Sequence, residues 1–85
     1  MPTYYLKGYE FVAPSKVSGK KYDAYKNGKY ITSFGSYGYS QYKDKIGHYK
    51  SFNNNDIKRK KLYYIRHNIN YKKETPDWFA KKFLW

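Results

Sequence analysis

The sequence predicts a small α+β domain, and three observations support this class. Segments rich in strand-forming residues occupy the first 35 positions, and the pair Asn27-Gly28 lies between two of them. Two helix-starting signals follow, at "NNND" (53–56) and at Thr75-Pro76. Strands followed by helices are typical of the α+β class, and a chain of 85 residues has the length of one domain.

We therefore expect residues 1–85 to form a single domain with four consecutive parts. These are an N-terminal strand and loop (1–20), a hairpin (21–35), an ordered Tyr- and Lys-rich loop (36–55) and two helices (56–85). The first strand is expected in "TYYLKGYEFV", which Gly8 interrupts. The following "APSKVSGKK" contains the Pro, Ser and Gly residues of a loop.

The hairpin prediction rests on Asn27-Gly28, because a type I′ turn needs positive φ at both central residues and Asn-Gly meets that need. Counting outward from the turn gives the expected pairs Lys26 with Lys29, Tyr25 with Tyr30, Ala24 with Ile31, and Asp23 with Thr32. After Phe34 the chain alternates Gly, Ser, Tyr and Lys without a clear period, which predicts an ordered loop held by its aromatic residues.

Both helices are predicted from their N-terminal signals. Residues of the "NNND" cluster are good N-caps, so a main helix is expected over about 56–69. Thr75 can cap a second helix with Pro76 at its first position, and this short aromatic helix is expected over about 76–85.

The hydrophobic pattern predicts which residues form the core. Leu62, Ile65 and Ile69 follow the i, i+3, i+7 spacing of a helix side that faces a core. The last helix carries large apolar groups almost all around, so it must be buried in the chain's own core or in a partner, and the chain's own core is favoured. The predicted core residues are Phe34, Leu62, Ile65, Ile69, Trp78, Phe79, Phe83 and Leu84.

The charge predicts an anionic partner. Eighteen Lys and Arg residues against six Asp and Glu give a formal charge of +12, an excess that repels itself unless a polyanion or counterions offset it. DNA, RNA, acidic lipid and an acidic protein surface all qualify. Coding bias is the alternative explanation, since A/T-rich codons encode Lys, Asn, Tyr and Ile.

The predicted binding surface lies opposite the aliphatic side of the main helix. There Arg59, Tyr63 and Arg66 share one stripe, and Lys60, Tyr64 and His67 share the next. A tyrosine ring between cations suits phosphate contacts beside a stacking base, although an ordinary solvated helix face has the same composition. The predicted polyanion-binding residues are Lys26, Lys29, Arg59, Lys60, Tyr63, Arg66 and His67.

Other functional classes lack the residues they need. The chain has no cysteine and only two histidines, His48 and His67, so no catalytic residues, metal site or cofactor are expected, and His48 is expected to be a hydrogen-bonding loop residue. We interpret the chain as a non-enzymatic protein. The N-terminus lacks the apolar run of a signal peptide, and no stretch approaches the length of a bilayer span.

The ordered series "FGSYGYSQYKDKIGHYKSFNNNDIKRKKLYYIRH" followed by "WFAKKFLW" resembles a small domain family of unknown function encoded by giant (nucleocytoplasmic large) DNA viruses. The resemblance covers about residues 21–85. The matching positions are Phe34, Gly35, Tyr42 to Lys45, Asn55, Asp56, Arg59, Lys60, Tyr63, Tyr64, Arg66, His67, Leu84 and Trp85. It implies a viral origin and a location in the virion or in the cytoplasm or nucleus of an infected host cell, and it implies no activity.

Two functions remain open. The first is binding of nucleic acid through phosphate contacts without sequence specificity, since no base-reading motif is present. The second is that of a minor capsid or other virion structural protein that bridges acidic virion proteins. The charge favours the first, and the oligomeric state is left open.

Overall fold

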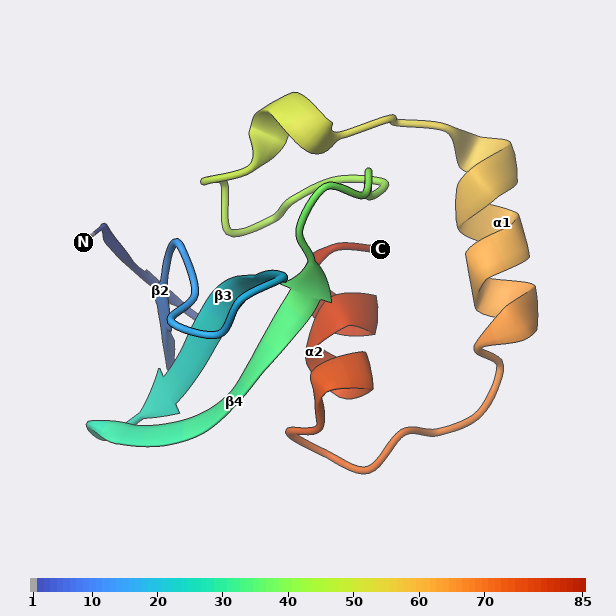
Figure 1. Ribbon diagram of the computed structural model, residues 1–85. Helices are drawn as coiled ribbons and strands as arrows, with labels where there is room; N and C mark the ends of the chain where they lie inside the picture. Colours follow the sequence, from blue (N-terminus) through green and yellow to red (C-terminus); the bar gives the residue numbers. More distant parts are fainter. Residues whose placement is uncertain (1) are drawn as a thin grey trace.

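The computed structural model describes residues 2–85 and confirms the α+β class (Figure 1). An antiparallel sheet has the strand order β1-β2-β3-β4, so each strand pairs with its neighbour in sequence. The elements are β1 (Thr3–Leu6), β2 (Tyr9–Val12), β3 (Lys20–Lys26), β4 (Lys29–Ser36), a 3-10 helix η1 (Lys50–Phe52), α1 (Ile57–Arg66) and α2 (Pro76–Phe83). Figure 1 shows α2 beside β4, with α1 set apart at the right edge of the molecule.

The expected N-terminal strand is two strands joined by a tight turn. Lys7 and Gly8 have φ values of 51° and 85°, so both central residues of the β1–β2 turn lie in the left-handed region. Asn27 and Gly28 repeat this geometry between β3 and β4, with φ values of 52° and 76°. The first turn was missed because lysine seldom adopts positive φ and is therefore no turn signal.

The predicted β3–β4 register holds only next to the turn. Lys26 pairs with Lys29 and Tyr25 with Tyr30 as expected. A shift between Ala24 and Tyr25 then changes the partners, so Ala24 pairs with Thr32 and Asp23 with Ser33, and the predicted pairs with Ile31 and Thr32 are wrong. The shift sets Tyr22 opposite Phe34, and the two buried rings stack with centroids 5.6 Å apart. Burial of this aromatic pair explains why the bulged register is preferred.

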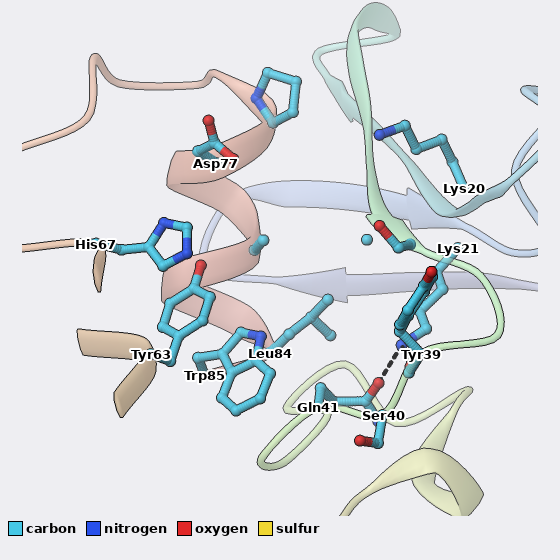
Figure 2. Close-up of a pocket in the computed structure, with 14 residues that line it drawn as sticks. Lys20, Lys21, Tyr39, Ser40, Gln41, Tyr63, His67, Asp77, Leu84 and Trp85 are labelled. Atoms are coloured by element: carbon cyan, nitrogen blue, oxygen red, sulfur yellow. Dashed lines mark hydrogen bonds between the residues drawn. The ribbon is translucent and has the colours of Figure 1, made fainter. Parts of the chain in front are cut away.

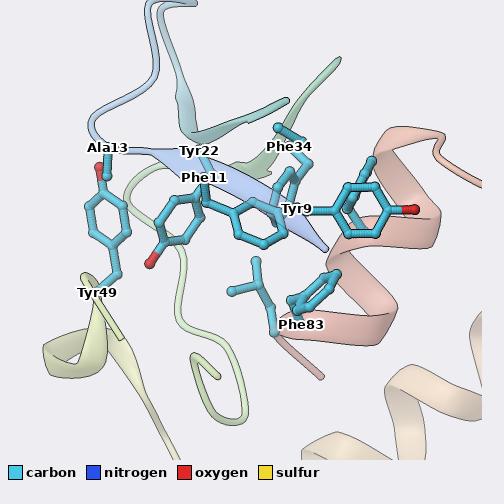
Figure 3. Close-up of a cluster of buried hydrophobic side chains, with 10 residues drawn as sticks. Tyr9, Phe11, Ala13, Tyr22, Phe34, Tyr49 and Phe83 are labelled. Carbon is cyan, nitrogen blue, oxygen red and sulfur yellow. The ribbon is translucent and has the colours of Figure 1, made fainter. Parts of the chain in front are cut away.

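Aromatic rings from the sheet and α2 form the core (Figure 3). Phe11 of β2 lies at its centre, with the ring of Phe83 at 4.9 Å between centroids, and Phe34 stacks on Phe79 at 5.2 Å. The structure buries Phe34, Phe79, Phe83 and Leu84 as predicted, and it packs Trp78 partly buried against them. The full set of buried hydrophobic residues is Tyr9, Phe11, Ala13, Tyr22, Ala24, Phe34, Tyr49, Phe79, Phe83 and Leu84.

Both helices begin where their caps predict. The Asp56 carboxylate accepts hydrogen bonds from the backbone N–H groups of Lys58 and Arg59, and the Thr75 hydroxyl accepts one from Trp78. The ends differ from the prediction. α1 stops at Arg66, because the next residue has left the helical conformation, and α2 stops at Phe83.

The side of α1 predicted to face the core faces solvent. Leu62, Ile65 and Ile69 are 48%, 67% and 60% exposed, so their assignment to the core is wrong. Contacts on the opposite side set the rotation of the helix. Tyr63 stacks on Trp85, and the hydroxyl of Tyr64 reaches the carbonyl oxygen of Lys81. Since the sheet and α2 already close the core, α1 is held by aromatic and polar contacts rather than by its aliphatic residues.

Buried polar side chains, as well as aromatic ones, order the segment 36–55. The Gln41 amide donates to the Tyr49 carbonyl at 2.9 Å and to the Asn53 side chain at 2.7 Å. The Asp44 carboxylate accepts from the Tyr22 hydroxyl and from the backbone N–H groups of Ile46 and Tyr49. The His48 ring hydrogen-bonds the Tyr4 hydroxyl at 2.8 Å and its backbone N–H donates to the Tyr22 hydroxyl at 3.0 Å, as expected for a hydrogen-bonding loop residue.

Candidate polyanion-binding surface

The loop that contains "YKDK" lies against the C-terminal end of α2. The backbone N–H of Lys45 donates to the carbonyl of Phe83 at 3.0 Å, and that of Lys43 donates to Leu84 at 3.1 Å. The Lys45 ammonium donates to the carbonyl of Lys82 at 2.9 Å. These bonds satisfy carbonyls that a helix end leaves without partners, and they fix the positions of the loop lysines.

Five lysines gather around this contact and are called the lysine cluster. Its members are Lys7, Lys43, Lys45, Lys60 and Lys82. Burial lowers the pKa of Lys45, and the positive charges of the other four lower it further. Lys60 approaches from α1, with its ammonium 4.4 Å from the centroid of the Tyr42 ring. The fold therefore brings together cations from the β1–β2 turn, the "YKDK" loop and both helices.

The acidic residues are engaged elsewhere. Asp23 accepts hydrogen bonds from the hydroxyls of Ser15 and Ser33, and Glu74 accepts one from the Tyr9 hydroxyl at 2.7 Å. Asp56 caps α1, and Asp44 holds its own loop. Four of the six carboxylates thus bind hydroxyl or backbone N–H groups, and the net charge of +12 remains after all six are counted.

The seven predicted binding residues do not form one surface. Only Lys60 belongs to the lysine cluster. Lys26 and Lys29 are exposed at the β3–β4 turn, on the side of the molecule away from α1 (Figure 1). Arg59 and Arg66 are exposed on α1.

Tyr63 and His67 are half-buried in a column of rings instead of lying on an open face. The ring of Tyr63 stacks on Trp85 with centroids 4.6 Å apart and planes 5° apart, and its other face stacks on His67 at 4.2 Å. Burial raises the pKa of the Tyr63 hydroxyl. His67 hydrogen-bonds the Tyr71 hydroxyl through Nδ1. Both faces of Tyr63 are covered, so the ring holds α1 in place and is not open to a stacking base.

The two arginines of the chain, Arg59 and Arg66, line one groove with a volume of about 370 Å³. Leu62, Tyr63 and Trp85 provide its apolar wall. Tyr39 and Ser40 close the other side, and a guanidinium nitrogen of Arg59 donates to the Ser40 hydroxyl at 3.2 Å. We call this site the arginine groove.

A second cavity, of about 360 Å³, adjoins the arginine groove (Figure 2). In Figure 2 the stack of His67, Tyr63 and Trp85 lies on one side and Lys20 and Lys21 lie on the other. Lys21 is only 1% exposed, and its ammonium donates to the Tyr39 carbonyl at 2.7 Å and to the Gln41 side chain. Burial lowers the pKa of Lys21 to about 8, an effect that the Asp44 carboxylate partly opposes.

Within residues 2–85, no three His, Asp or Glu side chains gather as a metal ion would require. None of the described helices has the length and apolar character to cross a bilayer. Compared with protein-family models, with curated proteins and with solved structures, the chain gives no match.

The sequence reasoning missed the lysine cluster because its members come from four separate segments. One local signal was available. The pair Lys43 and Lys45 flanks Asp44 in the "YKDK" loop, where both lysines are exposed and Asp44 is buried. Lys7 and Lys82 carry no comparable signal, since only the folded sheet and α2 bring them near the loop.

Proposed function

We propose that this protein binds a polyanion, nucleic acid in the first place, through phosphate contacts at the lysine cluster. One observation carries the proposal, namely that four other lysines lie near enough to Lys45 for their charges to lower its pKa, while most carboxylates are committed to other partners. Like charges so placed raise the free energy of the folded chain, and an anion bound among them removes that cost. Phosphate oxygens are the natural ligands for such a cluster.

The proposed binding is independent of base sequence. Lysine ammonium groups act as point charges and carry no planar pattern for reading base edges. The ring of Tyr63, first considered as a stacking surface, has both faces covered by Trp85 and His67. Contacts to the phosphate backbone therefore supply the affinity, and the affinity depends steeply on salt.

Fluorescence anisotropy with labelled duplex and single-stranded DNA across a salt series tests the proposal. Five phosphate contacts give a slope of about −4.5 in log K against log salt, or a loss of roughly 500-fold between about 50 and 200 mM salt. The Lys43→Gln/Lys82→Gln variant removes two exposed cations of the cluster and is expected to flatten the slope by about 2.

The Lys26→Gln/Lys29→Gln variant is the matched control, because it removes the same charge at the β3–β4 turn. It is expected to change the slope by less than about 1. Equal losses in the two variants would mean that net charge, rather than the lysine cluster, governs binding. Absence of binding at low salt would reject the nucleic-acid proposal altogether.

A bridging role between virion proteins is the second candidate function. The exposed aliphatic side chains of α1 favour it, because a nucleic-acid backbone gives no reason to expose them. For both candidates we propose a viral setting, the virion or an infected cell, on the strength of the sequence resemblance.

A further inference from the structure

The outer face of α1 combines aliphatic and basic side chains that residues 2–85 leave exposed. We call its aliphatic part the aliphatic stripe, which consists of Ile57, Leu62 and Ile65. Each is about half exposed or more, from 48% to 67%. Lys58 and Lys61 alternate with these side chains along the helix and are also exposed. Ile69 follows the end of α1 and lines a separate groove with Tyr64 and Trp78. Three exposed branched aliphatics on one short helix are unusual for a surface that contacts only water.

The arginine groove continues this face. Leu62 belongs both to the aliphatic stripe and to the wall of the groove, and Arg59 and Arg66 stand at the same edge. The chain has sixteen lysines and only two arginines, and both arginines line this groove. A guanidinium can bind a carboxylate through two parallel hydrogen bonds, which an ammonium cannot do. The Ser40 hydroxyl, the present partner of Arg59, is neutral and can be exchanged for an anion.

From this surface we infer that α1 docks an acidic amphipathic segment of a partner protein. An apolar side chain of the partner enters the arginine groove against Leu62, Tyr63 and Trp85, and its carboxylates pair with Arg59 and Arg66. The remaining apolar residues of the segment cover the aliphatic stripe. Aromatic and arginine residues around an apolar pocket are the composition found where binding energy concentrates in protein interfaces.

Three other occupants fit less well. A second copy of the chain would set Lys58, Lys61 and both arginines against the same cations. A nucleic-acid duplex presents sugars and phosphates rather than apolar groups to the aliphatic stripe, and an unpaired base cannot stack on the covered ring of Tyr63. An anionic bilayer is flat and would leave the concave groove unfilled.

A synthetic amphipathic peptide of about 18 residues, with Leu and Phe at helical spacing and Glu beside them, is the probe. Its binding to the full chain is measured by titration calorimetry and by tryptophan fluorescence in a Trp78→Phe background, in which Trp85, which lines the groove, is the remaining tryptophan. There are two control peptides. The first has the same composition with the apolar spacing scrambled, and the second has Lys in place of each Glu. The protein variants are Leu62→Gln/Ile65→Gln and Arg59→Gln/Arg66→Gln, with Lys26→Gln/Lys29→Gln as the control for lost charge.

The acidic peptide is expected to bind at least tenfold more tightly than either control peptide. Each of the two α1 variants should weaken binding tenfold or more, and the turn variant less than twofold. DNA binding at the lysine cluster should be unchanged in Leu62→Gln/Ile65→Gln, so a failure of either proposal is visible separately.

Equal binding of the scrambled peptide, or full binding by the Leu62→Gln/Ile65→Gln variant, would overturn the inference. Two further results would do the same. In the first, the protein binds phosphatidylcholine vesicles that contain phosphatidylserine, and the acidic peptide does not displace it from them. That result would assign the face to a membrane. In the second, sedimentation equilibrium shows a dimer of the wild type and a monomer of the Leu62→Gln/Ile65→Gln variant. That result would assign the face to a second copy of the chain.

Discussion

Replacing Tyr63 by alanine should destabilise the protein far more than replacing Ile65, although sequence periodicity alone predicts the reverse. Ile65 is 67% exposed, so alanine forfeits about one third of a side-chain burial worth about 1.5–3 kcal/mol. The better helix propensity of alanine returns about 0.5 kcal/mol, and the net loss is about 0.5 kcal/mol or less. Tyr63 is half-buried, and its burial and its stack on Trp85 together give a loss of about 2–3 kcal/mol.

Equilibrium urea unfolding of the two variants against the wild type measures both values. The transition midpoints are compared at equal slope, because a changed slope would indicate partial unfolding of α1. A loss of 2 kcal/mol or more in Ile65→Ala together with about 0.5 kcal/mol or less in Tyr63→Ala would refute the orientation of α1 described above.

Four further predictions concern buried ionisable groups and close contacts. Between pH 8 and 10 the free energy of unfolding should rise with pH. The unfolded chain keeps the Lys21 proton up to its ordinary pKa of 10.5, whereas the folded chain releases it at about 8. Urea midpoints across this range should rise in the wild type and not in Lys21→Met. Above pH 10 the free energy of unfolding should fall with pH. Burial raises the pKa of tyrosines such as Tyr9, to about 12, so the folded chain keeps a hydroxyl proton that the unfolded chain has already lost. Gly35→Ala should lower the free energy of unfolding by about 1–3 kcal/mol. The added Cβ would lie 3.0 Å from Leu84 Cδ1, and residue 35 has a φ of +79°. An unchanged melting temperature would contradict this packing. Asp44→Ala should lower the free energy of unfolding by about 3 kcal/mol or more, because it leaves the Tyr22 hydroxyl and two backbone N–H groups without their acceptor. A loss below about 1 kcal/mol in urea unfolding would show that other contacts hold the 36–55 loop.

The parts of the fold that local chemistry specifies could be predicted from the sequence. Asn27-Gly28 specified its turn because few other pairs accept two positive φ values. Asp56 and Thr75 specified the starts of both helices because their side chains accept the free N–H groups of the first turn. The register shift beyond Tyr25 could not be predicted in this way, since burial of Tyr22 against Phe34 causes it.

The orientation of α1 and the lysine cluster depend on contacts between distant segments. Both sides of α1 carry groups able to pack, and the choice falls on the aromatic side because Trp85 stacks on Tyr63. The aliphatic pattern predicted a buried side, and that prediction is wrong for this chain, because the core is complete without these residues. Of the predicted binding residues, Lys60 lies in the cluster because α1 passes beside Tyr42, a proximity that no spacing in the sequence indicates.

Backbone NMR of the isotope-labelled protein, titrated with a short DNA duplex at low salt, tests the central claim most directly. Binding at the lysine cluster predicts that the amide signals of Lys43, Lys45, Lys60 and Lys82 shift together and return when salt is added. The signals of Lys26 and Lys29 at the β3–β4 turn should move little. Shifts spread evenly over all exposed lysines, or centred on the β3–β4 turn, would contradict a phosphate-binding site at the lysine cluster.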